Sequence, residues 1–257
     1  MPPSAAGDRG FTKRRADAPP GFFEVEAAGL RWLDVPGGVP VAAVLSVDAN
    51  SITIGRVETV PPTPRAAARF GALLAATHDA GASAFGVGPD GWDRGGYIGD
   101  APLSLRPETT WGSFYAHQRV LPYARAAVRK GSVDAAGLIV IEAVAERLAS
   151  GVFDDEAPPA RIHGDLWSGN VLFSGDAATL IDPAAHGGHR LTDLAMLALF
   201  GLPYLEDVLA AYEDESRQLP PGWRGLIGLH QVHPLLVHAV LFGGGYGDQA
   251  VRIAGRY

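Results

Sequence analysis

The sequence predicts an α+β protein, with a small antiparallel sheet near the N-terminus and a larger, mainly helical remainder. The first observation is a pair of runs rich in Val and Ile, 40–46 and 51–57, whose connection through Asp48-Ala-Asn50 is typical of a hairpin. The second is an alanine-rich helical periodicity that begins at Pro64. Three prolines within four residues separate the two regions. We therefore expect an N-terminal lobe over 1–60 and a helical lobe over 61–257.

The elements of the N-terminal lobe follow from local signals. Residues 8–15 predict a turn and a short strand that starts at Gly10. A Pro-Pro pair precedes apolar residues at near-helical spacing, among them Phe22, Phe23 and Leu30, which predicts a helix over 21–33. A further helix runs from 64 to a C-terminal cap at Gly81.

The elements of the helical lobe continue this pattern. A long segment, 81–107, is rich in Gly, Pro and Asp, and loops of that length in compact domains are usually functional. Helices are expected near 108–130 and 133–150, and at 191–200, 204–216 and 222–242. Between them, 161–182 indicates a loop, a strand, a turn and a second strand.

Composition excludes several functional classes. With 257 residues, 47% of them hydrophobic and 19% charged, the chain is expected to fold as a globule. A net charge of −7 with scattered basic residues argues against a nucleic-acid partner. The apolar stretch around Leu194 to Pro203 is half of the ~20 residues that a membrane helix needs, so no membrane partner is expected. The absence of cysteine fits a cytoplasmic location.

One segment carries most of the chemistry. His163-Gly-Asp165-Leu-Trp-Ser-Gly-Asn170 is followed twelve residues later by Asp182, at the end of an apolar strand. An aspartate, an asparagine and a second aspartate thereby meet at the mouth of one hairpin. Phosphoryl transfer needs a base for the attacking hydroxyl, oxygen ligands for Mg²⁺ and positive charge on the phosphates. Magnesium prefers a few carboxylate or amide oxygens together with phosphate and water.

Several of these residues also have structural interpretations. Asp165 alone is also compatible with a turn, because Gly-Asp is common there. His163 is expected to be a hydrogen-bonded scaffold residue, Asp193 to brace the loop and Arg190 to pair with an acid. Ser168 lacks the G-x-S-x-G pattern of a nucleophile elbow. The other histidines lack the H-E-x-x-H pattern of a zinc hydrolase and are expected in the core or on the surface: His186, His189, His230, His233 and His238.

Four segments together resemble the fructosamine kinase (ketosamine-3-kinase) family, within the aminoglycoside phosphotransferase and protein-kinase-like superfamily. These are HGDLWSGNVLF, LIDPA, GGHRLTDLAMLALFG and HPLLVHAVLFGGGY. The resemblance runs from about Lys13 to Tyr257 and is strongest over 160–246. It implies a two-lobed protein-kinase-like fold, ATP and Mg²⁺ as cofactors, and phosphorylation of a hydroxyl of a ketosamine such as a fructosamine or ribulosamine.

The resemblance also implies roles for individual residues. Asp165 would be the catalytic base, and Asn170 and Asp182 would hold the metal. Lys13, one of only two lysines in the chain, would pair with the nucleotide phosphates, and Glu26 would orient it.

Further positions match the family less directly. The hinge that binds adenine through its backbone would fall at Gly55, Arg56 and Val57, although the family usually has glutamate where Gly55 stands. Trp167 is expected either to line the sugar pocket or simply to pack. Four residues of a matching helical stretch are expected to pack rather than to contact substrate: Trp111, Phe114, Tyr115 and Arg119.

The segment before Lys13 departs from the pattern. Kinase-like N-lobes place two strands and a glycine-rich turn before the lysine strand, whereas twelve residues precede Lys13 here. At ~3.3 Å per residue, twelve residues make at most one strand and its turn. We therefore expect the first strand and the nucleotide loop to be missing, through a truncated start or a true loss. Three functions remain open: a ketosamine kinase, another small-molecule kinase of the aminoglycoside or choline type, and an inactive pseudokinase. The oligomeric state is not indicated.

Overall fold

The computed structural model describes residues 10–216 and 218–257. Its strands are β1 (Gly10–Arg14), β2 (Val44–Asp48), β3 (Ser51–Gly55), β4 (Gly96–Ile98), β5 (Ala101–Leu103), β6 (Ala160–Ile162), β7 (Val171–Ser174), β8 (Ala177–Leu180) and β9 (His186–Gly188). Its α-helices are α1 (Phe22–Leu33), α2 (Pro64–Asp79), α3 (Trp111–Phe114), α4 (Leu121–Arg129), α5 (Ala135–Ala149), α6 (Leu191–Phe200), α7 (Leu205–Glu215), α8 (Ile227–Phe242) and α9 (Tyr246–Ala254). A π-helical turn, Tyr115–Val120, joins α3 to α4, and 3₁₀ turns cover Ser168–Asn170 and Trp223–Leu226.

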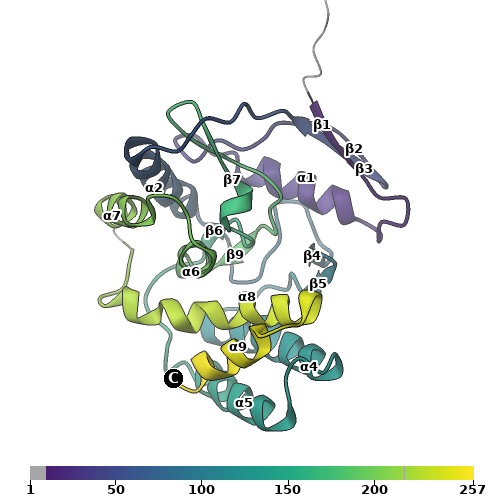
Figure 1. Ribbon diagram of the computed structural model, residues 1–257, viewed down its shortest axis with the longest axis vertical. Coiled ribbons are helices and arrows are strands. Elements are labelled where there is room, and N and C mark those ends of the chain that lie inside the picture. Colours follow the sequence, from purple (N-terminus) through teal and green to yellow (C-terminus); the bar gives the residue numbers. More distant parts are fainter. Residues whose placement is uncertain (1–9, 217) are drawn as a thin grey trace, which may run out of the picture.

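The N-terminal sheet is antiparallel with strand order β1-β3-β2, and α1 lies beside it (Figure 1). Ile52 and Ile54 of β3 are buried against Phe23 and Leu30 of α1. Directly opposite residues of antiparallel strands project to the same face. Lys13 lies opposite Ile52, so its side chain projects toward α1.

The helices form two further cores below the sheet (Figure 1). In one core, α2, α6, α7, β7 and β8 pack together, with buried residues such as Phe70, Leu180 and Leu197. In the other, the β4–β5 hairpin packs with α3, α4, α5, α8 and α9. The catalytic-loop candidates lie between these cores and the sheet, because the loop from β6 to β7 and the loop after β8 both open there.

Helix α8, with the 3₁₀ turn before it, is long and apolar enough to cross a membrane by length and composition alone. The stretch Trp223–Phe242 has 20 residues, a mean hydropathy of 1.4 and half of its apolar window buried. Residues Leu229, Val232 and Leu236 of this helix are fully buried in the core, where α8 packs against α4, α6 and α9. The high hydropathy of α8 is therefore explained by its packing in the core. The sequence analysis considered only the shorter apolar stretch 194–203, and the stretch Trp223–Phe242 is longer.

Most predicted elements are confirmed, including the helix at 21–33, the hairpin over β2 and β3, and the capped end of α2 at Gly81, whose φ is +71°. Five elements were missed: β4, β5, β6, β9 and α9. The segment predicted as a loop, 81–107, contains the β4–β5 hairpin, β9 pairs with β6, and α9 follows α8. The missed strands have only three residues each, too few to show a period of two.

Two predictions about the N-terminal region are left open. The expected loss of a first strand and glycine-rich turn falls largely on residues 1–9, which lie outside the described residues. The lobe boundary after residue 60 also stays a prediction.

Candidate active site

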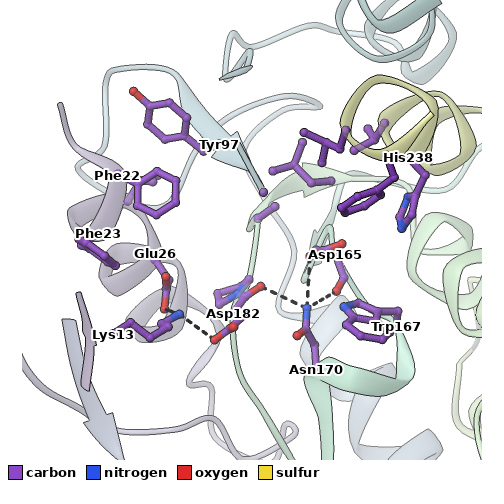
Figure 2. Close-up of a pocket in the computed structure, with 18 residues that line it drawn as sticks. Lys13, Phe22, Phe23, Glu26, Tyr97, Asp165, Trp167, Asn170, Asp182 and His238 are labelled. Carbon is purple, nitrogen blue, oxygen red and sulfur yellow. Dashed lines mark hydrogen bonds and ion pairs between the residues drawn. The ribbon is translucent and has the colours of Figure 1, made fainter. Parts of the chain in front are cut away.

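A cavity of about 420 Å³ lies where α1, the β4–β5 hairpin, the catalytic-loop segment and the end of α8 meet (Figure 2). Its volume falls in the range of about 300–1,000 Å³ that is usual for small-molecule sites. Five of the eight predicted site residues line it: Lys13, Glu26, Asp165, Asn170 and Asp182.

Lys13 joins two carboxylates at one end of the cavity. It extends from β1 and forms an ion pair with Glu26 of α1, and its Nζ lies 2.9 Å from Asp182 Oδ1 (Figure 2). Glu26 is only 8% exposed. Burial raises the pKa of Glu26, and the charge and hydrogen bond of Lys13 oppose that rise. The lysine is therefore fixed in place by a largely buried partner, while Asp182 faces the cavity.

Asn170 connects the two loops that carry the aspartates. Its Nδ2 donates to the backbone oxygen of Asp165 at 2.8 Å, to Asp165 Oδ2 at 3.3 Å and to the backbone oxygen of Asp182 at 3.4 Å. The backbone of Asn170 also accepts a hydrogen bond from Ile181 N at 3.2 Å. Because Asn170 Nδ2 donates hydrogen bonds to both aspartates, Asn170 Oδ1 is the side-chain atom that could bind a cation.

Asp165 has the electrostatics of a base that works near neutral pH. Burial raises its pKa to about 7, the negative charges of Asp182 and Asp193 add to the rise, and the hydrogen bond from Asn170 opposes it. An ideal general base has a pKa close to the working pH. The same carboxylate faces the cavity and lies beside Asn170 and Trp167 (Figure 2).

His163 is a scaffold residue, as predicted. Its Nδ1 accepts a hydrogen bond from Asp165 N at 3.2 Å, and its Nε2 donates to the backbone oxygen of Ile181 at 2.9 Å. This pair of partners requires the neutral tautomer with the proton on Nε2. Burial lowers the pKa of His163, which keeps it neutral. Both ring nitrogens are thus occupied in holding the two loops together.

Asp193 braces the start of the catalytic loop, which confirms the prediction. This fully buried carboxylate accepts hydrogen bonds from His163 N at 2.7 Å and Gly164 N at 2.9 Å, and it pairs with His78 Nε2 at 3.1 Å. Burial alone disfavours its charge, but the hydrogen bonds from His78 and Gly164 hold the pKa of Asp193 below its usual value. Gly164 has a φ of +80°, and a Cβ there would lie 2.3 Å from the backbone oxygen of Ala184. The loop can therefore turn here only with glycine.

Replacing Asp193 by Asn is expected to lower the free energy of unfolding by about 3 kcal/mol, because one half of a buried charged network is removed. The Asn side chain also has one acceptor fewer for the two backbone N–H groups. Urea denaturation at pH 7 checks this change. Asp248→Asn on α9, outside the core clusters, serves as the control and should stay within about 0.5 kcal/mol of the parent chain. An equally small change for Asp193→Asn would contradict the bracing role.

The remaining predicted residues lie elsewhere. Gly55 ends β3, Arg56 and Val57 follow it, and none of the three lines the cavity, so their contact with adenine stays a prediction. Gly55 N already donates to Ala43 O at 2.7 Å, and a contact of adenine with this N–H would require that bond to break. Trp167 lines the cavity and is 42% exposed, and its ring covers Gly169 so closely that a Cβ there would lie 2.3 Å away.

The histidines outside the loop make ion-pair and ring contacts within the helical region. His189 pairs with Asp155 at 3.1 Å, and the ring of His230 stacks on Trp111 with centroids 4.5 Å apart. Arg190 pairs with Asp79 at 2.7 Å, as predicted. Four residues lie in the helical core, also as predicted: Trp111, Phe114, Tyr115 and Arg119. Within 10–216 and 218–257, no group of three or more His, Cys, Asp or Glu is placed to hold a metal ion.

Several cavity residues were missed by the sequence analysis. Tyr97, Ile98 and Gly99 come from the β4–β5 hairpin, and Leu241 and Phe242 come from the end of α8. The one signal for the hairpin was the unusual length of the Gly- and Pro-rich segment. Nothing in the pattern of α8 distinguishes its cavity-facing end from its core-facing residues.

Comparison with known proteins identifies the family of this chain. The sequence profile of the fructosamine kinase family matches residues 4–257. The chain belongs to this family. It is 50% identical to a Thermobifida fusca protein of known crystal structure, described as a putative fructosamine-3-kinase, with a TM-score of 0.88 over 96% of this chain and 86% of that one.

Two further relatives support the family and the fold. A probable ketoamine kinase from Thermus thermophilus is 32% identical over 93% of this chain and 83% of its own length. The aminoglycoside phosphotransferase APH(4)-Ia is 19% identical and has a TM-score of 0.56 over 90% of this chain and 83% of that one, a likeness that concerns the fold alone. The predicted α+β, kinase-like fold class is thus confirmed.

Proposed function

We propose that this chain is an ATP-dependent kinase that phosphorylates a hydroxyl of a ketosamine, such as a fructosamine or a ribulosamine. Membership of the fructosamine kinase family supports the reaction class. The observation that carries the proposal is one cavity that holds both Asp165, with a pKa of about 7, and the Lys13–Glu26–Asp182 cluster. A base for the acceptor and a cation for the phosphates are the two parts that phosphoryl transfer asks of a protein.

In the proposed reaction, Asp165 orients the acceptor hydroxyl and takes its proton as the oxygen bonds to the γ-phosphorus of ATP, while the bond from that phosphorus to the β,γ-bridging oxygen breaks and ADP leaves. The hydrogen bonds from Asn170 fix the carboxylate, so little reorganisation is needed when the acceptor arrives. Lys13 turns its ammonium group from Asp182 to the phosphates, while Glu26 keeps it in place. The neutral His163 holds the backbone of this loop and takes no part in proton transfer.

Asn170 and Asp182 are the residues we assign to Mg²⁺. Their oxygen donors fit a hard cation that keeps water and phosphate as its other ligands. Asp182 has a φ of +56°, a region that Asp and Asn enter more readily than other non-glycine residues. When bound, the metal supplies positive charge to the β- and γ-phosphate oxygens. The role of this chain is to present two fixed oxygen donors beside Lys13.

The test is a panel of acceptors with the purified chain and Mg-ATP, followed by release of ADP and by mass spectrometry of the product. The panel holds a ribulosamine, a fructosamine, an aminoglycoside and choline, and Asp165→Asn prepared in parallel controls for contaminating kinases. We expect a product that is heavier than its acceptor by about 80 Da, the mass of an added phosphoryl group, and we expect it from the ketosamines only. Turnover of only the aminoglycoside or choline would show that the chain is a small-molecule kinase of that type and not a ketosamine kinase. ATP binding without turnover of any acceptor would indicate a pseudokinase.

A further inference from the structure

The cavity lining has a polar part and an apolar part. The polar part holds the proposed catalytic residues. The apolar part consists of side chains from three separate elements: Phe22 and Val25 of α1, Tyr97 and Ile98 of the hairpin, and Val237, Leu241 and Phe242 of α8. Figure 2 shows Phe22 and Tyr97 on the same side as Glu26. The proposed reaction uses none of these apolar side chains, and an acceptor whose hydroxyl lies at Asp165 shares the cavity with them.

The hairpin side of this apolar part of the lining is held rigidly against α1. The rings of Phe22 and Tyr97 lie 5.2 Å apart, and Tyr97 OH donates to the backbone oxygen of Pro20 at 3.2 Å. Arg15 Nη1 lies 2.6 Å from Asp100 Oδ1 at the hairpin turn, and its guanidinium lies 5.2 Å from the centre of the Phe22 ring. Because aromatic side chains fixed in this way keep their shape, they select ligands by fit rather than adapting to each one.

The opposite side of the cavity presents apolar surface that the chain leaves uncovered. Phe242 is 70% exposed and Trp167 is 42% exposed, and both line the cavity. Exposed aromatic side chains at a cavity mouth are typical of surfaces that become buried when a ligand binds.

Among the residues that the structure describes, the lining offers no free partner for an anionic substituent. Lys13 is the one lysine or arginine of this described lining, and two carboxylates already engage it. His238 also lines the cavity, but burial lowers its pKa, and its Nδ1 donates to the backbone oxygen of Pro234 at 2.8 Å. Moving a carboxylate out of water without a charged partner is costly.

From these contacts we propose that the amine substituent of the ketosamine lies against Phe22, Tyr97 and Phe242, and that the enzyme selects ketosamines of uncharged, apolar amines over those of amino acids. This inference rests on the proposed function. The apolar substituent gains from burial against the aromatic side chains, whereas an α-carboxylate loses its hydration there. Arg94 is the alternative partner for a carboxylate, since it lines a separate cavity that shares Tyr97 as a wall.

The experiment compares ribulosamines that share one sugar and differ in the amine: butylamine, phenethylamine and glycine. We expect kcat/KM for the butylamine and phenethylamine derivatives to exceed that of the glycine derivative by at least about tenfold. Tyr97→Ser should reduce this ratio by at least about threefold, whereas Tyr97→Phe, which keeps the ring, should preserve it. Ile139→Ser, at an exposed position of α5 outside the cavity, is the control and should match the parent chain.

The outcomes separate this inference from the proposed function. If all three ribulosamines are phosphorylated equally well, or if the glycine derivative is preferred, the apolar selection is wrong although the chain is a ketosamine kinase. If no ribulosamine or fructosamine is phosphorylated, the proposed function itself is wrong. Circular dichroism and the melting temperature verify that each variant is folded. If Tyr97→Ser does not fold, the ratio of kcat/KM between the apolar-amine and glycine ribulosamines, measured on the parent chain, tests the inference.

Discussion

Asp165→Asn is expected to lower kcat for the ketosamine by about 10²–10⁴-fold, the usual contribution of a general base. The substitution keeps the shape of the side chain and its hydrogen bond with Asn170, but it removes the proton acceptor. ATP does not depend on that group for binding, so its affinity should change by less than about threefold. Isothermal titration with ATP and steady-state rates measured on the same preparations test the two expectations separately.

The same residue predicts how the rate depends on pH. Since burial raises the pKa of Asp165 to about 7, the carboxylate is largely protonated below that pH and cannot accept a proton. We expect kcat/KM for the ketosamine to fall about tenfold per pH unit below pH 7 and to level off above it. The residual rate of Asp165→Asn should lack this acid limb. A profile that is flat from pH 5 to 8 would show that another group is the base.

Stability gives a second measure of the buried carboxylate. Its pKa in the folded state lies above the unfolded value, so the favourable contribution of its protonated form is complete below the unfolded pKa and is lost as pH rises through about 7. Asparagine does not ionise. The melting temperature of Asp165→Asn relative to the parent chain should therefore be higher at pH 8 than at pH 5, which also separates lost chemistry from lost folding.

The sequence predicts those parts of the site whose residues lie close together along the chain, and it does not by itself predict the parts that meet only in the folded structure. The catalytic loop lies within eight residues, and Asp182 follows one short hairpin, so their meeting is a local property of the chain. Lys13 and Asp182 are 169 residues apart, and only the resemblance to a family placed them together. The geometry then agrees, because the register of β1 on β3 directs Lys13 toward α1.

The apolar part of the cavity lining could not be predicted in the same way. The β4–β5 hairpin has three residues in each strand, and its position depends on contacts with α1, such as Phe22 with Tyr97 and Arg15 with Asp100. Such strands are stabilised by tertiary packing rather than by intrinsic preference. The hydrophobic periodicity of α8 shows that its residues are buried, but it does not show which of them face a cavity.

Lys13→Met is expected to lower kcat/KM for ATP by about 10²–10³-fold, because one preorganised positive charge is removed from the phosphates. The chain offers a matched control in its other lysine. Lys130, an exposed residue at the end of α4, lies outside the cavity, and Lys130→Met should leave the rate unchanged. Rates measured over a range of ATP concentrations, with the acceptor saturating, give the comparison.

A double-mutant cycle with Glu26 tests why Lys13 is effective. Glu26→Gln alone should lower kcat/KM for ATP by about tenfold. Lys13 then keeps its ion pair with Asp182 but loses Glu26, the buried partner that fixes its position. In Lys13→Met, Glu26 stays buried without an opposing cation, so its charge destabilises the fold, and adding Glu26→Gln should raise the melting temperature. The rate of the double variant should then equal that of Lys13→Met, since Glu26 acts only through the lysine. If the two single effects multiply instead, Glu26 contacts the nucleotide or its metal by an independent route.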